Sequence, residues 1–424
     1  MLNFLRPLFP MGQLARSTYI TASWMVLRVA LQTVWVAFIA HALGPDGYGF
    51  LAGITALAAT LGTFTGMGSG VLLLQDASRD ARAFPLAWKR ALAMSVLTGC
   101  LLSATYIMFV PNAFPIHGGR DIFTAVAVTE VLCFPIITNA SYAFQAHERM
   151  GWAGTLQAAA PAGNVVAVGL FGWLSHTRSL DSYMHFHATM AVVMALTSIA
   201  LVKNRLSPSP THFVTTSRDL KEGFGFSIMR LADTALVTLD KTLALRIAGS
   251  HPAGIYSAAY RLVSVASLPL ISLSMSALPR LFRANRNDLA TGSFVRTLVV
   301  VVVVYGVFSG MAIWFLAGLL PMILGDGFRP SIEVARWMAA SPLLQGLYMI
   351  GANLLVTQKM VGLRVVAQLL TLGVMLLAAI ILIPTFGLAG MVGMLLVTQL
   401  VGASLMWACY AWGRYLAHKD SLGL

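Results

Sequence analysis

A cation with aromatic and amide neighbours lies inside the first long apolar stretch of the chain. Trp24, Arg28 and Gln32 recur at helical spacing with Thr21 and Trp35, which puts all five near one face of a helix. A guanidinium group flanked by indoles and an amide suits an anionic, sugar-bearing headgroup, which it would bind by charge and by stacking. The alternative is a structural arginine that pairs with a carboxylate on a neighbouring helix.

A second charged face lies in the less apolar stretch 223–248. Arg230, Asp233, Asp240 and Lys241 fall on one side of a helix. Four charges within a membrane-length segment need a wet environment, so we expect them to line a cavity. In the alternative, Arg230 and Asp233 neutralise each other as i,i+3 neighbours.

Two further ionisable residues lie deep within apolar stretches. Glu130 is a candidate for a proton or cation site, and Asp233 is the second candidate for such ion coupling. Glu130 could equally be the salt-bridge partner of Arg28. Arg261 lies at a depth similar to that of Lys241, and we expect it to extend the same basic surface.

The sequence holds no enzyme signature: GxxxxGK[ST], HExxH and GxSxG are all missing. The glycine-rich run 66–70 lies near the end of an apolar stretch, where it favours close helix packing over nucleotide binding. Three isolated cysteines indicate neither a metal cluster nor a disulfide framework. We therefore predict no catalytic residue, no bound metal and no cofactor.

The composition dictates which elements must position these residues. The chain has 424 residues, of which 58% are hydrophobic and 10% charged, with a mean hydropathy of +0.78. Soluble domains carry about 25% charged residues, so a soluble enzyme is excluded. Spans of ~20 apolar residues divide the chain into twelve candidate transmembrane helices. They lie near 18–42, 49–74, 88–110, 122–145, 152–175, 184–203, 223–248, 254–279, 296–321, 331–357, 362–384 and 388–413.

The loops between these spans differ in charge. Most Lys and Arg fall in the loops on the side of the N-terminus, and the opposite loops hold only Arg120, Arg178, Arg246 and Arg329. This bias predicts cytoplasmic N- and C-termini. It also accounts for much of the net charge of +13 without nucleic acid. The N-terminus shows no cleavable signal peptide, so we expect the first span to remain as an anchor.

A polar connection at 204–222 separates two halves of six spans, 1–203 and 223–424. At an offset of 207 residues, Pro45 pairs with Pro252, Gly47 with Gly254 and Ser69 with Ser276. Transporters built from such parallel repeats bind their substrate at the repeat interface. We therefore expect an N-terminal lobe, a cytoplasmic linker and a C-terminal lobe, with the charged faces of spans one and seven lining a central cavity.

Three short motifs resemble bacterial polysaccharide flippases. LGPDGYG at 43–49 is similar to their turn after the first helix, and the segment 239–286, with its Asp-Lys pair and GIYSAAYR, resembles their seventh and eighth helices. ERMGWAGTLQAA at 148–159 is similar to their loop and fifth helix. The resemblance implies membership of the multidrug/oligosaccharidyl-lipid/polysaccharide (MOP) exporter superfamily. It also implies an all-α, two-lobed bundle of twelve helices that works by alternating access.

The resemblance makes a specific function the leading expectation. The substrate would be an undecaprenyl-diphosphate-linked oligosaccharide, moved from the cytoplasmic to the periplasmic leaflet of the bacterial inner membrane. The product would feed lipopolysaccharide or exopolysaccharide synthesis. Expected partners are membrane lipids and a polysaccharide polymerase or export machinery, with the chain itself a monomer.

The alternatives are a cation-coupled multidrug antiporter and a membrane-embedded polysaccharide polymerase or ligase. The antiporter should favour acidic cavity residues, whereas the deep charges here are at least as often Arg and Lys. The embedded enzyme should carry a sizeable periplasmic loop, and the longest polar loop here is predicted to be cytoplasmic. Lipid II flippases are related to polysaccharide flippases, but they usually have fourteen helices, whereas this chain has room for twelve.

Overall fold

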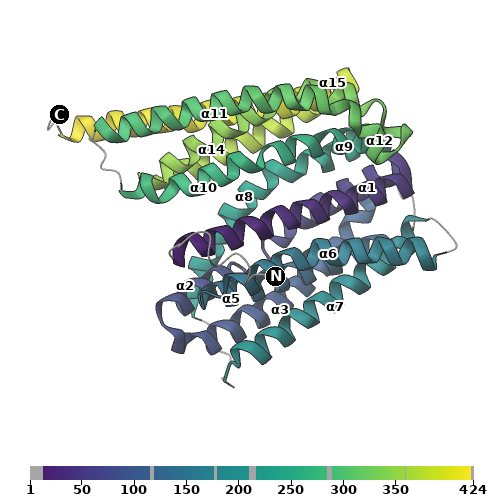
Figure 1. The fold of residues 1–424 in the computed structure, drawn as a ribbon, viewed down its shortest axis with the longest axis horizontal. Coiled ribbons are helices and arrows are strands. Elements are labelled where there is room, and N and C mark those ends of the chain that lie inside the picture. Colours follow the sequence, from purple (N-terminus) through teal and green to yellow (C-terminus); the bar gives the residue numbers. More distant parts are fainter. Residues whose placement is uncertain are drawn as a thin grey trace, which may run out of the picture. The chain divides into compact units, whose positions relative to one another are not determined.

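The chain folds as a set of long α-helices (Figure 1). The computed structural model describes residues 13–114, 119–175, 179–209, 216–283, 289–358 and 360–421. Within these ranges all regular secondary structure is helical. This confirms the predicted all-α class. In a bilayer, segments this apolar can satisfy their backbone hydrogen bonds only as helices or closed barrels.

The helices in the first half of the chain are α1 (Gln13–Gly62), α2 (Ser69–Arg79), α3 (Phe84–Ala113), α4 (Arg120–Val126), α5 (Phe134–Ala146), α6 (Met150–Leu174) and α7 (Leu180–Leu206). A π-helical turn, η2 (Ala127–Cys133), joins α4 to α5. The second half contains α8 (Ser217–Ala248), α9 (Ser250–Ala266), α10 (Leu268–Arg283), α11 (Leu289–Leu316), α12 (Leu320–Leu324), α13 (Ser331–Trp337), α14 (Ser341–Thr357) and α15 (Val361–Ser421). The short 3₁₀ turns are η1 (Ala81–Ala83), η3 (Ala317–Leu319), η4 (Asp326–Phe328) and η5 (Met338–Ala340).

These elements supply the twelve predicted spans. Seven helical stretches among the described residues are long and apolar enough to cross a membrane, or eight when α9 and α10, bent by 41°, count as one. Two of the seven, Ser23–Gly62 and Val361–Tyr415, are 40 and 55 residues long, about twice what one crossing requires. Each holds two helices that meet at a kink. The predicted spans 152–175 and 223–248 correspond to α6 and α8, which are not among these stretches.

Both kinks depend on glycine. Gly44 has φ +65° in α1, and Gly387 has φ +54° in α15. Residues with a Cβ rarely adopt positive φ, so glycine is the residue that lets the chain turn there at little conformational cost. Gly44 lies between the predicted spans one and two, and Gly387 lies between spans eleven and twelve, so the helices break where the predicted spans are separated.

By packing, the chain divides into two compact units. The first comprises residues 1–39 and 61–228, and the second comprises residues 40–60 and 229–424. The expected division put the whole of 1–203 in one lobe. In the structure, the second part of α1 packs with the later helices instead.

The first unit is held by a core of small and aromatic side chains. Leu73 of α2, Trp88 of α3, Phe144 of α5 and Leu156 of α6 are buried together. Gly66 and Gly68, both at positive φ, form the tight connection from α1 to α2. An added Cβ on Gly68 would lie 2.2 Å from the carbonyl oxygen of Gly223, so the glycine-rich run serves close packing.

In the second unit, residues 40–60 cross α9 at glycines. A Cβ on Gly49 would lie 2.0 Å from the carbonyl oxygen of Ser250, and one on Gly254 would lie 2.0 Å from that of Pro45. Further along, Thr242 Oγ1 donates to the carbonyl of Gly53 at 2.8 Å. Small residues let these backbones approach closely, as is common between membrane helices.

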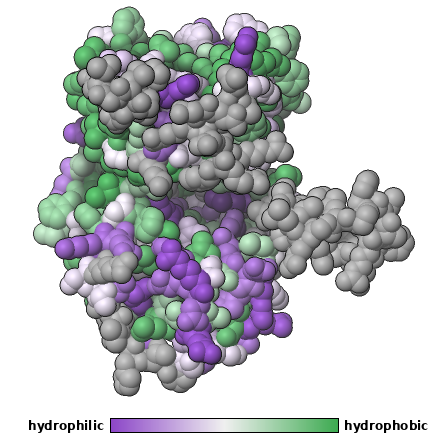
Figure 2. All heavy atoms as spheres, turned by 90° about the vertical axis from the view of Figure 1, so that its left-hand side faces the viewer, coloured by the Kyte–Doolittle hydropathy of each residue, from purple (hydrophilic) through white to green (hydrophobic). Residues whose placement is uncertain are grey.

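Large apolar side chains remain exposed along the outer helices. Phe109 of α3 is 61% exposed, Phe308 of α11 is 63% exposed and Ile380 of α15 is 65% exposed. Figure 2 shows apolar side chains along the flanks and hydrophilic ones gathered at one end of the first unit. Apolar surface of this extent indicates contact with lipid, consistent with a multi-pass membrane protein.

Candidate functional site

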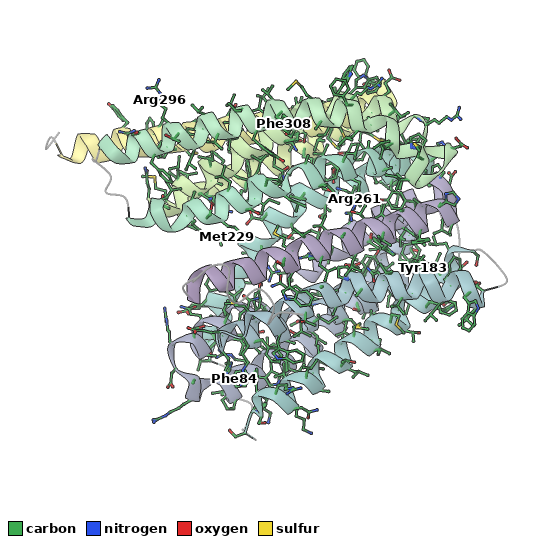
Figure 3. All side chains as sticks on the ribbon, viewed as in Figure 1. Phe84, Tyr183, Met229, Arg261, Arg296 and Phe308 are labelled. Atoms are coloured by element: carbon green, nitrogen blue, oxygen red, sulfur yellow. The ribbon has the colours of Figure 1, made fainter. Side chains whose placement is uncertain are left out.

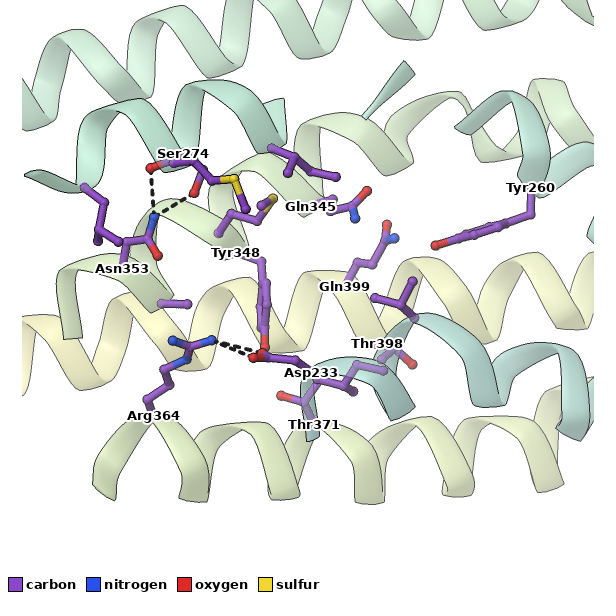
Figure 4. Close-up of a pocket in the computed structure, with 17 residues that line it drawn as sticks. Asp233, Tyr260, Ser274, Gln345, Tyr348, Asn353, Arg364, Thr371, Thr398 and Gln399 are labelled. Carbon is purple, nitrogen blue, oxygen red and sulfur yellow. Dashed lines mark hydrogen bonds and ion pairs between the residues drawn. The ribbon is translucent and has the colours of Figure 1, made fainter. Parts of the chain in front are cut away.

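The second unit contains a cavity of about 480 Å³ (Figure 4). Its walls come from α8, α9, α10, α14 and α15, and the volume lies within the range of small-molecule sites, about 300–1,000 Å³. Apolar side chains such as Ile271 and Leu278 form part of the wall. The polar lining residues are Asp233, Tyr260, Ser274, Gln345, Tyr348, Asn353, Arg364, Thr371, Thr398 and Gln399.

The charges in this lining neutralise each other. Arg364 Nη2 donates to both carboxylate oxygens of Asp233, at 3.0 and 3.1 Å. Gln368 donates a further hydrogen bond to the same carboxylate. The sequence offered Arg230 as the i,i+3 partner of Asp233, and this pairing is wrong: Arg230 is exposed, and Asp233 pairs with Arg364 from α15 instead.

The amides of the cavity are held by serines behind them. Ser341 Oγ donates to Gln399 Oε1 at 2.7 Å, and Ser267 Oγ lies 2.6 Å from Gln345 Oε1. Figure 4 shows Gln345 and Gln399 pointing toward each other. With its carbonyl occupied by a fully buried serine, Gln399 keeps its NH₂ group available to a ligand.

Asn353 presents a hydrogen-bond acceptor to the cavity, whereas Gln399 presents a donor. Its Nδ2 donates to the side-chain oxygen of Ser274 at 2.6 Å and to the Ser274 carbonyl at 3.3 Å. The carbonyl oxygen Oδ1 of Asn353 is therefore left to accept. Thr371 and Thr398 give their hydroxyl protons to backbone carbonyls of their own helix, at 2.7 and 2.6 Å, so their oxygens also remain acceptors.

The remaining charges of the predicted α8 face have other surroundings. Asp240 is 2% exposed and accepts hydrogen bonds from Tyr256 Oη at 2.7 Å and from Lys241 Nζ at 2.9 Å. Lys241 Nζ also lies 3.9 Å from the centre of the Tyr260 ring. Of the four charges predicted on this face, Asp233 lines the cavity, and Asp240 and Lys241 form a local ion pair with aromatic support.

Arg261, labelled in Figure 3, follows Tyr260 on α9 and is half-buried. Its Nε and Nη2 are buried and have no hydrogen-bond partner among the described residues. Tyr48 lies within its electrostatic reach. The cavity lining itself includes Tyr260 but not Arg261.

The residues predicted to share the Arg28 face of α1 have different surroundings in the structure. Arg28 is exposed and forms no ion pair with any described residue. The Trp24 indole packs on α6, where a Cβ on Gly154 would lie 2.3 Å from its Cδ1. Trp35 turns into the first unit and donates to Tyr183 Oη at 2.7 Å. Gln32 is half-buried.

Glu130 lies in the π-helical turn η2, which adds a residue to a helical turn and frequently marks a functional position. The Tyr106 and Tyr183 hydroxyls lie within electrostatic range of its carboxylate. Tyr183, labelled in Figure 3, also bonds to His187 Nδ1 at 3.1 Å. The ion pair between Glu130 and Arg28 that the sequence allowed is not formed.

The amide lining of the cavity was not among the residues singled out from sequence. Gln345, Tyr348 and Asn353 come from α14 and Gln399 from α15, while Gln368 of α15 is not a lining residue and donates to Asp233. A signal was present, because uncharged amides recur inside these long apolar stretches. Among the described residues, no three His, Cys, Asp or Glu side chains converge on a common metal position.

Solved structures share this architecture. A multidrug resistance MATE family transporter of the MOP superfamily, in its inward-facing conformation, matches with a TM-score of 0.70 at 14% identity, over 94% of this chain and 97% of that chain. Lipid II flippase MurJ, in an inward closed conformation, matches with a TM-score of 0.69 at 11% identity, over 92% and 86%. A MOP superfamily transporter from Pyrococcus furiosus Vc1 (DSM3638), described by the reverse polarity of its binding pocket, matches with 0.60 at 16% identity, over 96% and 95%.

The fold is therefore that of MOP superfamily transporters. No match was found among curated protein sequences. The sequence profile of the polysaccharide biosynthesis protein family matches residues 14–285. This chain belongs to that family, which confirms the family resemblance drawn from its motifs.

Proposed function

We propose that the protein moves a lipid-linked oligosaccharide across the bacterial inner membrane, from the cytoplasmic to the periplasmic leaflet, by alternating access. The observation that carries this proposal is the cavity of the second unit. Its lining is rich in uncharged amides and hydroxyls, and its two charges cancel. Such a lining suits the hydroxyl groups of sugars, which offer donors and acceptors in many directions.

Arg28 supports a lipid-linked form of the substrate. An exposed guanidinium group without an ion-pair partner among the described residues suits a diphosphate, which it can bind with two parallel hydrogen bonds. We propose undecaprenyl diphosphate as the carrier. Its polyprenyl chain would stay in the bilayer, since burying apolar groups there is favourable, while the headgroup would travel through polar surroundings.

A cation-coupled multidrug antiporter is the second candidate. Such a transporter needs an acidic group that a cationic substrate can reach. Of the residues that line the cavity, Asp233 is the one carboxylate, and Arg364 already neutralises it. This pairing favours the oligosaccharide over an organic cation.

The test uses proteoliposomes that contain the purified full-length protein and an undecaprenyl-diphosphate-linked oligosaccharide. We expect the sugar to become accessible to an external lectin in a protein-dependent manner. In cells, Arg28→Ala should abolish polymer export while the protein remains inserted in the membrane. Arg28→Lys should rescue export in part, because a point charge cannot reproduce the guanidinium fork.

Arg246→Ala is the matched control, because Arg246 is an exposed arginine in the last turn of α8. It should leave export unchanged. Full export by Arg28→Ala at normal expression would exclude a role for Arg28 in binding the diphosphate. Exchange of a cationic dye for protons, without any lectin-detected translocation, would favour the antiporter.

A further inference from the structure

The cavity of the second unit has a defined pattern of donors and acceptors. We infer that it is a sugar subsite selective for an uncharged residue that carries hydroxyl and acetamido groups, and that it rejects acidic and free amino sugars. This inference rests on the proposed function and names the substrate class for one of its sites. It is carried by the orientation of Gln399 and Asn353 and by the closed Asp233–Arg364 pair.

The donor side of the subsite is Gln399. Its Oε1 accepts from Ser341 Oγ, and the Ser341 residue is fully buried. With its oxygen engaged by that hydroxyl, the Gln399 amide presents its NH₂ group as the donor of this side of the subsite. An acetamido carbonyl or a sugar hydroxyl oxygen can accept from it.

The acceptor side is Asn353 with Thr371 and Thr398. Both donor contacts of the Asn353 amide go to Ser274, so its oxygen faces the cavity as an acceptor. The two threonine hydroxyls are committed as donors to their own helix, and both side chains are buried at the wall. Sugar hydroxyls and acetamido N–H groups are the donors that such a set can bind.

The charges of the cavity define what it rejects. Asp233 and Arg364 are the charged residues among those that line it, and they form an ion pair at 3.0 Å, so the lining carries no net charge. A uronate or an ammonium group would enter a lining without net counter-charge and would lose its hydration, which is strongly unfavourable. An uncharged acetamido sugar loses no charge solvation on entry.

Binding of three disaccharides to the purified full-length protein tests this selectivity. The probes are N,N′-diacetylchitobiose, its doubly de-acetylated amine form and a disaccharide of glucuronic acid, measured by titration calorimetry in detergent. We expect the neutral acetamido probe to bind at least about tenfold more tightly than either charged probe. Equal or tighter binding of a charged probe by the unmodified protein would overturn the inference.

Two substitutions at one position sharpen the test. Gln399→Leu removes the donor and should weaken the acetamido probe by about five- to tenfold, as expected for one lost hydrogen bond. Gln399→Glu replaces the donor with a carboxylate and should reverse the preference toward the amine form. Gln145→Leu, which removes a half-buried amide of α5 in the first unit, is the matched control and should bind as the unmodified protein does.

The proposed function and the subsite fail in different ways. Translocation in the proteoliposome assay without any preference among the three probes would overturn the subsite and leave the proposed function standing. Selective binding of the acetamido probe without translocation would support the subsite and contradict the proposed function. Binding that Gln399→Leu leaves unchanged would also overturn the subsite.

Discussion

The carboxylate of Asp233 on α8 and the guanidinium group of Arg364 on α15 form an ion pair across 131 residues of sequence. One nitrogen, Nη2, donates to both carboxylate oxygens, while the Arg364 side chain is 14% exposed and that of Asp233 is 43% exposed. The pair therefore joins two helices of the second unit at the wall of the cavity and removes the net charge there.

A double-mutant cycle on this pair should show coupling. Asp233→Asn and Arg364→Gln each leave one partly buried charge without its partner, and the double variant removes both charges. We expect a coupling energy of about 1 kcal/mol in the free energy of unfolding, within the range for residues in contact. Thermal unfolding in detergent measures it. Asp326 and Arg329, an exposed i,i+3 pair, are the matched control and should show no measurable coupling.

A second ion-pair network predicts a pH dependence of stability. Arg90, 7% exposed, bonds to Asp76 and to Asp219, at 2.7 Å each. Burial raises the pKa of the Asp219 carboxyl, but hydrogen bonds from Thr216 and the charge of Arg90 outweigh it. The net pKa therefore lies below the ordinary 3.8. A depressed pKa in the folded state stabilises the fold above the unfolded-state pKa, and this stabilisation is lost as the pH falls through the folded-state pKa.

Asp219→Asn should therefore lower Tm at pH 7, by about 1 °C for a loss of about 1 kcal/mol. The gap to the unmodified protein should close as the pH falls below 3.8. Scanning fluorimetry from pH 7 to pH 3 measures it, with Asp326→Asn as an exposed control that should change Tm little at pH 7. A Tm gap that stays constant down to the lowest pH would contradict the prediction.

Glu130 is the residue at which we expect a coupling ion to act. Glu130→Gln should abolish the dependence of translocation on an imposed proton or sodium gradient, because a neutral amide neither releases a proton nor holds a cation by charge. Glu130→Asp should retain part of it. The proteoliposome assay measures both variants against Glu333→Gln, which alters an exposed carboxylate on α13. An unchanged gradient response in Glu130→Gln would exclude coupling at this residue.

The predicted topology can be tested by single-cysteine labelling in a background without Cys100, Cys133 and Cys409. A cysteine at Ser209 should be protected from an impermeant maleimide in intact cells, because the connection 204–222 is expected to be cytoplasmic. A cysteine at Asn112, exposed near the end of α3, should react and serves as the positive control. Labelling at Ser209 in intact cells would contradict the twelve-span orientation.

The helical architecture was predictable from sequence because it depends on length and apolarity. A run of ~20 apolar residues has few stable alternatives to a helix in a bilayer. The breaks at Gly44 and Gly387 fall in the gaps between predicted spans, and glycine tolerates the positive φ that both adopt. These features are local, so the residues that determine them lie side by side in the chain.

The site was only partly predictable because it depends on contacts that are distant in sequence. Helical spacing placed Trp35 beside Arg28, but the Trp35 indole bonds to Tyr183, 148 residues away. Asp240 and Lys241, adjacent residues that helical geometry turns apart, form an ion pair at 2.9 Å because the long lysine side chain reaches back along α8. The π-helical turn that contains Glu130 also shifts the phase on which helical spacing relies.

The packing of residues 40–60 on α9 means that the two halves of the chain are not interchangeable modules. A polypeptide that began after Leu206 would contain α9 without the helix that Gly254 and Thr242 contact. Its exposed strip of small residues would have no covering surface until the other fragment supplied one. Expressed apart, the two fragments would therefore be incomplete. Expressed together, the N-terminal fragment would supply residues 40–60 to the C-terminal fragment, as one subunit supplies an element to another in a domain-swapped pair.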